Sequence, residues 1–148
     1  MSEVQGIDPT TVMPEEFAQL VANADDDQIA EAFRAVGTDQ VLDRIFEGMQ
    51  ERFVPEKAQG VDADIQWIVT DDGIEHTYLT AIRDGNCIVS KNASENPKVA
   101  LKTDVVSFSK LITGQAQGPQ LFMGGKLKVS GDLMFSQRIT GFFATPQA

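Results

Sequence analysis

The chain holds few of the residues that metal chemistry or nucleophilic catalysis requires. His76 is the only histidine and Cys87 the only cysteine among 148 residues, so a two-histidine metal motif, a Cys/His zinc cluster and an intramolecular disulfide are all unavailable. A Ser-His-Asp triad would have to use His76, which lies in a predicted strand, and the sequence has no Gly-x-Ser-x-Gly turn. We therefore expect no metal, no cofactor and no catalytic triad, with His76 on a sheet face and Cys87 acting as a small hydrophobic residue.

Two further patterns fail to match phosphate or acid-base chemistry. Gly124-Gly125-Lys126 lacks the preceding glycine of a phosphate-binding loop, and Leu127 stands where that loop needs Ser or Thr to hold magnesium. The acidic pairs Asp62/Asp64 and Asp71/Asp72 fit an exposed strand edge and a turn better than a pair of catalytic carboxylates. The sequence thus predicts a protein that is not an enzyme.

The charge of the chain is unevenly distributed. Residues 1–64 carry 15 Asp/Glu and 4 Lys/Arg, a net charge of −11, whereas the whole chain has −10. Such an acidic body repels a polyanion, so nucleic acid is not an expected partner. Asp25-Asp26-Asp27 fits either the solvated start of a helix or an acidic interaction surface.

The first residues and the hydropathy pattern predict where in the cell the protein is located. Residues 1–8 lack the basic start and the apolar stretch of a secretory signal, and no apolar run is long enough for a membrane span. We predict a cytoplasmic protein without a transmembrane helix.

Three helices are predicted in the first third of the chain. Pro14 opens a short one in which Phe17, Leu20 and Val21 share a face. A second runs from Asp25, with Gln28 in the reciprocal capping position, to Gly37. The third, capped by Thr38 and ended by Pro55, has the strongest apolar stripe, formed by Val41, Leu42, Ile45, Phe46, Met49 and Phe53.

From residue 62 the hydrophobic period changes from that of a helix to that of a strand. Strands are predicted at 62–69, 74–83, 87–90, 98–103 and 126–130, with turns at Asp71-Asp72-Gly73 and Asp84-Gly85-Asn86. A helix capped by Asp104 follows the fourth strand, and a closing helix begins after Gly131-Asp132. The predicted fold class is α+β, with one sheet and helices grouped on one of its faces.

The closing helix has more apolar residues than one narrow stripe requires. Its apolar residues must be covered on more than one side, by protein or by a ligand. A packed core explains most such patterns, and a ligand pocket is the other interpretation. The residues concerned are Leu133, Met134, Phe135, Ile139, Phe142 and Phe143.

Three spaced segments resemble the sterol carrier protein 2 (SCP-2) family. They are residues 96–104 (NPKVALKTD), residues 108–114 (FSKLITG) and residues 122–132 (FMGGKLKVSGD), and they occur in the family's order. The resemblance covers about residues 38–145, and the composition is typical of a stand-alone bacterial member. It divides the chain into an acidic helical extension, residues 1–37, and an SCP-2-like lipid-binding domain, residues 38–148.

The resemblance implies a five-stranded mixed sheet covered by helices, which together enclose an apolar lipid tunnel. The resemblance implies no catalytic residues. The function it implies is the binding and transfer of a sterol, fatty acid, fatty acyl-CoA or other lipid. Carried onto this sequence, the predicted lipid-binding residues are Ile45, Phe46, Met49, Trp67, Phe108, Leu111, Ile112, Phe122, Met123, Leu133, Met134, Phe135 and Ile139.

The sequence also suggests two other kinds of partner, a membrane surface and an enzyme. Lys98, Lys102, Lys126 and Lys128 either solubilise the strands that carry them or meet anionic headgroups in a transient membrane contact. Because SCP-2-like folds also accompany enzymes, a second hypothesis is an accessory module that docks to a lipid-metabolising enzyme. A lipid isomerase or hydrolase, the third hypothesis, lacks an identifiable general base.

Overall fold

The computed structural model describes residue 19 and residues 21–143. Pro14, Phe17 and Leu20 of the first predicted helix therefore lie outside the described residues, as does about half of the predicted extension 1–37, whereas residues 19 and 21–23 are helical and Val21 is buried. No helix within the described part is long and apolar enough to cross a membrane. The elements are α3 (Asp26–Val36), α4 (Thr38–Glu51), η1 (Pro55–Ala58), β1 (Ala63–Asp71), β2 (Ile74–Arg83), β3 (Asn86–Ser90), β4 (Val99–Asp104), α5 (Val105–Ile112), α6 (Gly118–Met123), β5 (Leu127–Gly131), α7 (Leu133–Ser136) and η2 (Ile139–Phe142).

The start of α3 follows the predicted capping pattern. Asp25 accepts a hydrogen bond from the Gln28 backbone N–H at 2.8 Å, and the Gln28 side chain accepts one from the Asp25 N–H at 2.9 Å. The predicted cap of α4 is wrong, because Gly37 occupies the N-cap position and Thr38 is the first helical residue. The Thr38 hydroxyl donates instead to Asp71 Oδ2, at the end of β1, at 2.5 Å.

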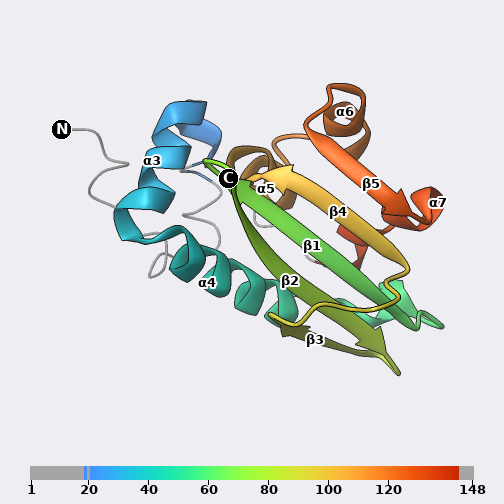
Figure 1. Cartoon of the computed structure of the whole chain (residues 1–148). Helices are drawn as coiled ribbons and strands as arrows, with labels where there is room; N and C mark the ends of the chain where they lie inside the picture. Colours follow the sequence, from blue (N-terminus) through green and yellow to red (C-terminus); the bar gives the residue numbers. More distant parts are fainter. Residues whose placement is uncertain (1–18, 20, 144–148) are drawn as a thin grey trace.

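The five strands form one mixed sheet in the order β3-β2-β1-β4-β5 (Figure 1). β1 and β4 are parallel, and the other neighbouring pairs are antiparallel. Because parallel neighbours need a crossover, the chain leaves the meander β1-β2-β3 and returns through residues 91–98 to pair with β1. The predicted α+β class and five-stranded mixed sheet are confirmed.

One face of the sheet forms the core. Alternate residues of β1, namely Ala63, Ile65, Trp67 and Val69, are at most 4% exposed and face α4 and α5. This is the alternation that the sequence predicts. Residues of α3, including Ile29 and Phe33, belong to the same hydrophobic core.

The opposite face of β1 is covered by the segment that precedes β4. Gln66 lies on this face and donates to the Tyr78 carbonyl at 2.8 Å, while its Oε1 accepts from the Ser94 N–H at 2.7 Å. Asp64 accepts from the Ser94 hydroxyl at 2.9 Å and pairs with Arg83 at 2.7 Å. These bonds hold residues 91–98 against the sheet.

The C-terminal elements differ from the prediction. The composition of residues 115–119 (QAQGP) predicts a turn, but Pro119 lies in the first turn of a short helix, α6. The long closing helix is also wrong: α7 ends after four residues, and η2, which contains Gly141, follows as a separate 3-10 turn.

Gly131, at the end of β5, lies where the backbone of β5 closely approaches Lys98, the residue before β4. Its φ is +99°, and an added Cβ would lie 2.5 Å from the Lys98 carbonyl oxygen. The next residue, Asp132, donates its N–H to that same carbonyl at 3.0 Å and caps α7 through the Phe135 N–H. Only glycine allows this approach of β5 to β4.

Candidate functional site

Four aromatic rings meet between the sheet and its helices. Phe46 of α4 stacks on Tyr78 of β2 with ring centroids 4.2 Å apart, and on Phe108 of α5 at 5.2 Å. Trp67 of β1 meets the edges of Phe46 and Phe108 at 6.0 and 5.7 Å. All four side chains are at most 3% exposed. We call them the aromatic cluster; its rings fill the space between α4, α5 and the sheet.

The polar atoms of the aromatic cluster are all bonded. The Trp67 indole N–H donates to Thr80 Oγ1 at 3.1 Å, and the Tyr78 hydroxyl donates to Asp43 Oδ1 at 2.5 Å. Lys91 Nζ lies 2.8 Å from the same Asp43 oxygen. Burial, followed by the hydrogen bond to Asp43, raises the pKa of Tyr78, so the phenol stays protonated and is not a base.

A second polar cluster, formed by the buried Asp71 with Arg34 and Thr38, lies at the end of β1. Asp71, only 8% exposed, accepts from Arg34 Nη2 at 3.1 Å and from Thr38. The hydrogen bond that Arg34 donates to Asp71 is the first cause that raises the pKa of Arg34. Every buried side-chain N or O atom in the described residues has a hydrogen-bond partner. The interior therefore offers a ligand apolar contacts and no free polar group.

The predicted lipid-binding residues fall into three groups. Ile45 and Ile112 are half-buried against the core. Seven lie in the interior with exposures of 8% or less: Phe46, Met49, Trp67, Phe108, Leu111, Phe135 and Ile139. Four are exposed, namely Phe122 (44%), Met123 (85%), Leu133 (46%) and Met134 (75%).

The short C-terminal helices explain why the exposed group is separated from the interior. In α6 only Leu121 is buried, and in α7 only Phe135 is. Phe135 packs against Phe142 of η2, with centroids 5.7 Å apart. A single continuous helix would have brought more of these side chains to one face.

Tyr78 and Thr80 are site residues that the sequence reasoning missed. Tyr78 lies directly opposite Trp67 in the β1-β2 ladder. The two-residue turn Asp72-Gly73 sets this register, so counting outward from the turn gives the pair. Asp43 and Asp71 have no comparable signal, because their partners come from elements far away in the sequence.

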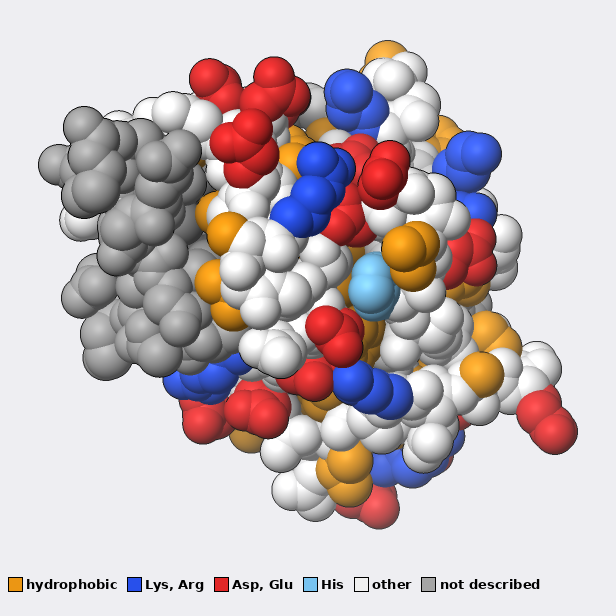
Figure 2. All heavy atoms as spheres, turned by 60° about the vertical axis from the view of Figure 1, so that its left-hand side comes forward, with side chains coloured by type: hydrophobic (Ala, Val, Ile, Leu, Met, Phe, Trp, Pro, Cys, Tyr) orange, Lys and Arg blue, Asp and Glu red, His pale blue; other side chains and the backbone are white. Residues whose placement is uncertain are grey.

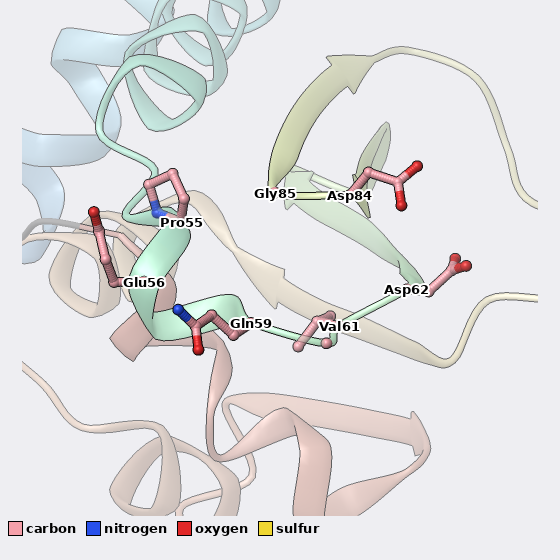
Figure 3. A pocket seen from close by; sticks show the side chains of 8 residues that line it. Pro55, Glu56, Gln59, Val61, Asp62, Asp84 and Gly85 are labelled. Carbon is pink, nitrogen blue, oxygen red and sulfur yellow. The ribbon is translucent and has the colours of Figure 1, made fainter.

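An open groove of about 490 Å³ lies beside this interior, between η1 and the β2-β3 turn (Figure 3). Pro55, Glu56 and Gln59 form one side, and Asp84 and Gly85 the other. Asp62, also in the lining, pairs with Arg83 at 3.2 Å. Three lining residues, Glu56, Asp62 and Asp84, are acidic and the groove is open to solvent, so it is poorly suited to a lipid chain.

The structure brings no catalytic constellation together within residues 21–143. His76 pairs with Val69 across the β1-β2 ladder. Cys87 is buried, and burial raises the pKa of its thiol to about 12, which makes it a poor nucleophile at neutral pH. No group of three or more His, Cys, Asp or Glu side chains there has the arrangement of a metal site.

Comparison with protein families identifies one match. The SCP-2 sterol transfer family matches residues 42–144, which include most of α4, the whole sheet and α5 to η2. No curated protein sequence is significantly similar to the chain.

Several solved structures share the fold. Sterol Carrier Protein 2 from Yarrowia lipolytica, in its apo form, has a TM-score of 0.60 and 23% identity; the match covers 71% of this chain and 88% of that one. Palmitated SCP2L2 from Aedes aegypti has a TM-score of 0.55 and 15% identity, covering 70% and 95% of the two chains.

The sec-alkylsulfatase Pisa1 from Pseudomonas sp. has a TM-score of 0.62 and 18% identity. The match covers 76% of this chain but 17% of the sulfatase, so this chain corresponds to about a sixth of that enzyme. The same fold therefore occurs both as most of a small protein and as a minor part of a large one.

Proposed function

We propose that this chain, which belongs to the SCP-2 sterol transfer family, binds a single hydrophobic ligand between its sheet and helices and carries it without transforming it. The ligand classes are a sterol, a fatty acid, a fatty acyl-CoA or another lipid. The observation that carries the proposal is the interior itself, where aromatic and aliphatic side chains meet and every polar atom is already bonded.

The proposed lining consists of the buried group of predicted residues. They come from four elements and the last 3-10 turn, so a ligand among them would touch β1 of the sheet and the helices α4, α5 and α7. They are Phe46, Met49, Trp67, Phe108, Leu111, Phe135 and Ile139.

Binding requires these side chains to move apart, because the aromatic cluster fills the interior. The cover formed by α7 and η2 is the easiest part to displace, since each has only four residues and a single helical turn has little stability of its own. Its attachments to the end of α4 are the bridge between Phe53 and Phe143 and the 2.7 Å hydrogen bond from the Val54 N–H to the Phe142 carbonyl.

The expected affinity follows from the apolar surface that is buried. A chain of a dozen methylenes gains on the order of 10 kcal/mol at about 0.8 kcal/mol each, from which roughly 4–15 kcal/mol of association cost is subtracted. Micromolar affinity and tolerance of chain length are the expected result, because one methylene changes the binding energy by only about 1 kcal/mol.

The single tryptophan provides a direct test. Trp67 lies within the proposed site, so stearic acid carrying a doxyl quencher in mid-chain should quench its fluorescence in a saturable way at micromolar concentration. Unlabelled stearic acid should reverse the quenching. Absence of saturable binding would overturn the proposal.

A second variant distinguishes the interior from the surface. In Trp67→Phe/Phe122→Trp the reporter moves to exposed α6, and the same ligand should quench it much less. Stronger quenching at position 122 than at Trp67 would place the ligand on the surface and contradict the proposed site.

The second candidate is an accessory module that docks to a lipid-metabolising enzyme. The observation that favours it is the match to about a sixth of the Pisa1 chain, where the fold is part of an enzyme. In that case the isolated chain would bind no lipid in the quenching experiment until the partner enzyme is added.

A further inference from the structure

The large hydrophobic side chains that face solvent are concentrated in one short segment. Among the described residues six large hydrophobics are exposed, and four of them, Phe122, Met123, Leu133 and Met134, lie within thirteen residues of one another. The other two, Ile74 and Ile88, are on β2 and β3. Isolated exposed hydrophobics are common, but such a concentration indicates a contact surface.

The four residues lie at the two ends of one strand. β5 is the last strand of the sheet, and Figure 1 shows α6 at its start and α7 at its end, on the side away from β3 and α4. Five residues of strand span about 17 Å, so the two apolar pairs mark the two ends of this edge. We call this surface the β5 edge; it comprises Phe122, Met123, Lys126, Lys128, Leu133, Met134 and Arg138.

The β5 edge also holds basic side chains without acidic partners. Within residues 21–143, no carboxylate lies within 4 Å of Lys126, Lys128 or Arg138, whose side chains are exposed. Arg138 instead lies over the rings of Phe135 and Phe142. Elsewhere most basic residues have ion pairs: Arg34, Arg44, Arg83, Lys91, Lys98, Lys102 and Lys110.

Charged and hydrophobic side chains are unevenly distributed over the molecule. Residues 98–143 carry six Lys/Arg and two Asp, whereas the chain as a whole has a net charge of −10. Seen from the side of α3, the described surface is mostly polar, and its hydrophobic side chains form small separate areas (Figure 2). Four of the six exposed large hydrophobic side chains and three basic side chains without an ion pair to a described carboxylate therefore occur together on the β5 edge, which lies at the end of the molecule opposite α3 (Figure 1).

We propose that the β5 edge docks on the surface of a membrane that contains anionic lipids. The apolar pairs on α6 and α7 would enter the interface between headgroups and acyl chains, while Lys126, Lys128 and Arg138 would meet the negative headgroups. The acidic end would point away from the bilayer, so its repulsion would be reduced by distance and by salt. This inference extends the proposed function, since a lipid carrier exchanges its cargo with membranes, but docking itself requires no ligand.

Charge argues against a second copy of the chain as the occupant. If two β5 strands paired edge to edge, Lys126 and Lys128 of the two copies would be brought close together. Lysine on an edge strand is a common means of preventing such pairing. An anionic surface, in contrast, attracts the same lysines.

Vesicle flotation with the full chain tests the inference. We expect binding to phosphatidylcholine vesicles that contain 30% phosphatidylserine, little binding to pure phosphatidylcholine, and release by 0.5 M NaCl. In Lys126→Gln/Lys128→Gln the affinity should fall about 30-fold, since each lysine contributes about fivefold, equivalent to ~1 kcal/mol. In Met123→Ser/Met134→Ser it should also fall at least tenfold.

Matched controls remove the same groups from elsewhere. Arg44→Gln/Lys57→Gln removes two positive charges from α4 and η1, and Ile74→Ser/Ile88→Ser removes the other two exposed aliphatic side chains. Both should bind vesicles nearly as well as the unmodified chain. Equal losses in the controls, or no binding to anionic vesicles, would overturn the inference.

Two other outcomes would also overturn it. A dimer that the Met123/Met134 variant dissociates would assign the β5 edge to a second copy, and binding that appears only with a protein partner would assign it to that partner. Doxyl-stearate quenching of Trp67 is measured in parallel without vesicles, so failure of docking and failure of ligand binding are distinguishable.

Discussion

The aromatic cluster and the β5 edge use similar side chains in opposite ways. Phe46, Trp67 and Phe108 are buried and in contact, and the hydrogen bonds of Thr80 and Asp43 complete the cluster. On the β5 edge Phe122 and Met123 are exposed, and the nearby cations have no carboxylate within 4 Å among the described residues. The side chains of the aromatic cluster are packed and hydrogen-bonded within the core. Those of the β5 edge include apolar and charged groups that no described residue covers.

This difference separates two roles that the sequence reasoning had merged. All thirteen predicted residues were assigned to one lipid tunnel, yet four of them face solvent at the β5 edge. Hydrophobic composition alone therefore does not identify a ligand site. The surroundings of each side chain decide whether it stabilises the fold, lines a ligand or contacts a surface.

The largest effect should follow from truncating a ring of the aromatic cluster. Phe46→Ala leaves a cavity between α4 and the sheet and should lower the free energy of unfolding by about 3–5 kcal/mol. Phe122→Ala on the β5 edge should cost less than about 1 kcal/mol, because its ring is 44% exposed. Urea denaturation of the two variants measures both values, and similar losses would mean that the two regions do not differ as described.

The backbone of the β5 edge should be far less tolerant than its side chains. Gly131→Ala places a Cβ 2.5 Å from the Lys98 carbonyl oxygen at a φ of +99°, so the end of β5 must move. We expect a loss of about 3 kcal/mol in unfolding free energy.

Gly125→Ala is the matched control for this substitution. Its φ is +76°, but no atom lies within 4 Å of the added Cβ, so the loss should be about 1 kcal/mol. Equal effects at the two positions would show that conformation alone, and not the approach to Lys98, makes glycine necessary at position 131.

Local patterns in the sequence predicted the sheet and the first helices well. The capping box at Asp25 and Gln28, the turns at Asp72-Gly73 and Asp84-Gly85 and the alternation in β1 depend on residues close together in the chain. Helix caps and two-residue turns act over such short distances. The mixed, five-stranded character of the sheet in addition was implied by a resemblance and not by any single pattern.

The C-terminal elements were harder to predict because tertiary contacts determine them. Leu133 and Met134 match an apolar helix stripe, but Phe135, Ile139 and Phe142 are the side chains that bury, and they do so from separate turns. The cap of α4 was misassigned for the same reason: Thr38 bonds to Asp71, 33 residues away. Periodicity reports local conformation and does not reveal such partners.

A smaller effect should follow from removing one hydrogen bond of the aromatic cluster. Thr80→Val keeps the shape of the side chain but leaves the Trp67 indole N–H without an acceptor, at a cost of about 1–2 kcal/mol. Thr77→Val, on the opposite face of β2, should be nearly neutral. Urea denaturation measures the cost, and near-UV circular dichroism reports the environment of Trp67; an unchanged Thr80→Val variant would contradict the assigned bond.

The smallest expected effect on stability comes from the bonds of Asp64, on the sheet face opposite the core, and it depends on pH. Asp64 accepts from Arg83 and from Ser94, and the hydrogen bond from Arg83 is the first cause that lowers its pKa below the usual 3.8. A carboxylate whose pKa is depressed by folding stabilises the protein above the unfolded pKa, and this contribution is lost as pH falls through the folded pKa.

Arg83→Gln should therefore lower the urea midpoint at pH 6 and have progressively less effect below pH 4. Asp62→Asn is the control, because Asp62 also pairs with Arg83 but is 77% exposed, and solvent screens such a pair. A difference between Arg83→Gln and the unmodified chain that stays constant down to pH 3 would mean that Arg83 acts through packing. Convergence at low pH would instead show that Arg83 acts through the charge of Asp64, the carboxylate to which Ser94 of residues 91–98 is bonded.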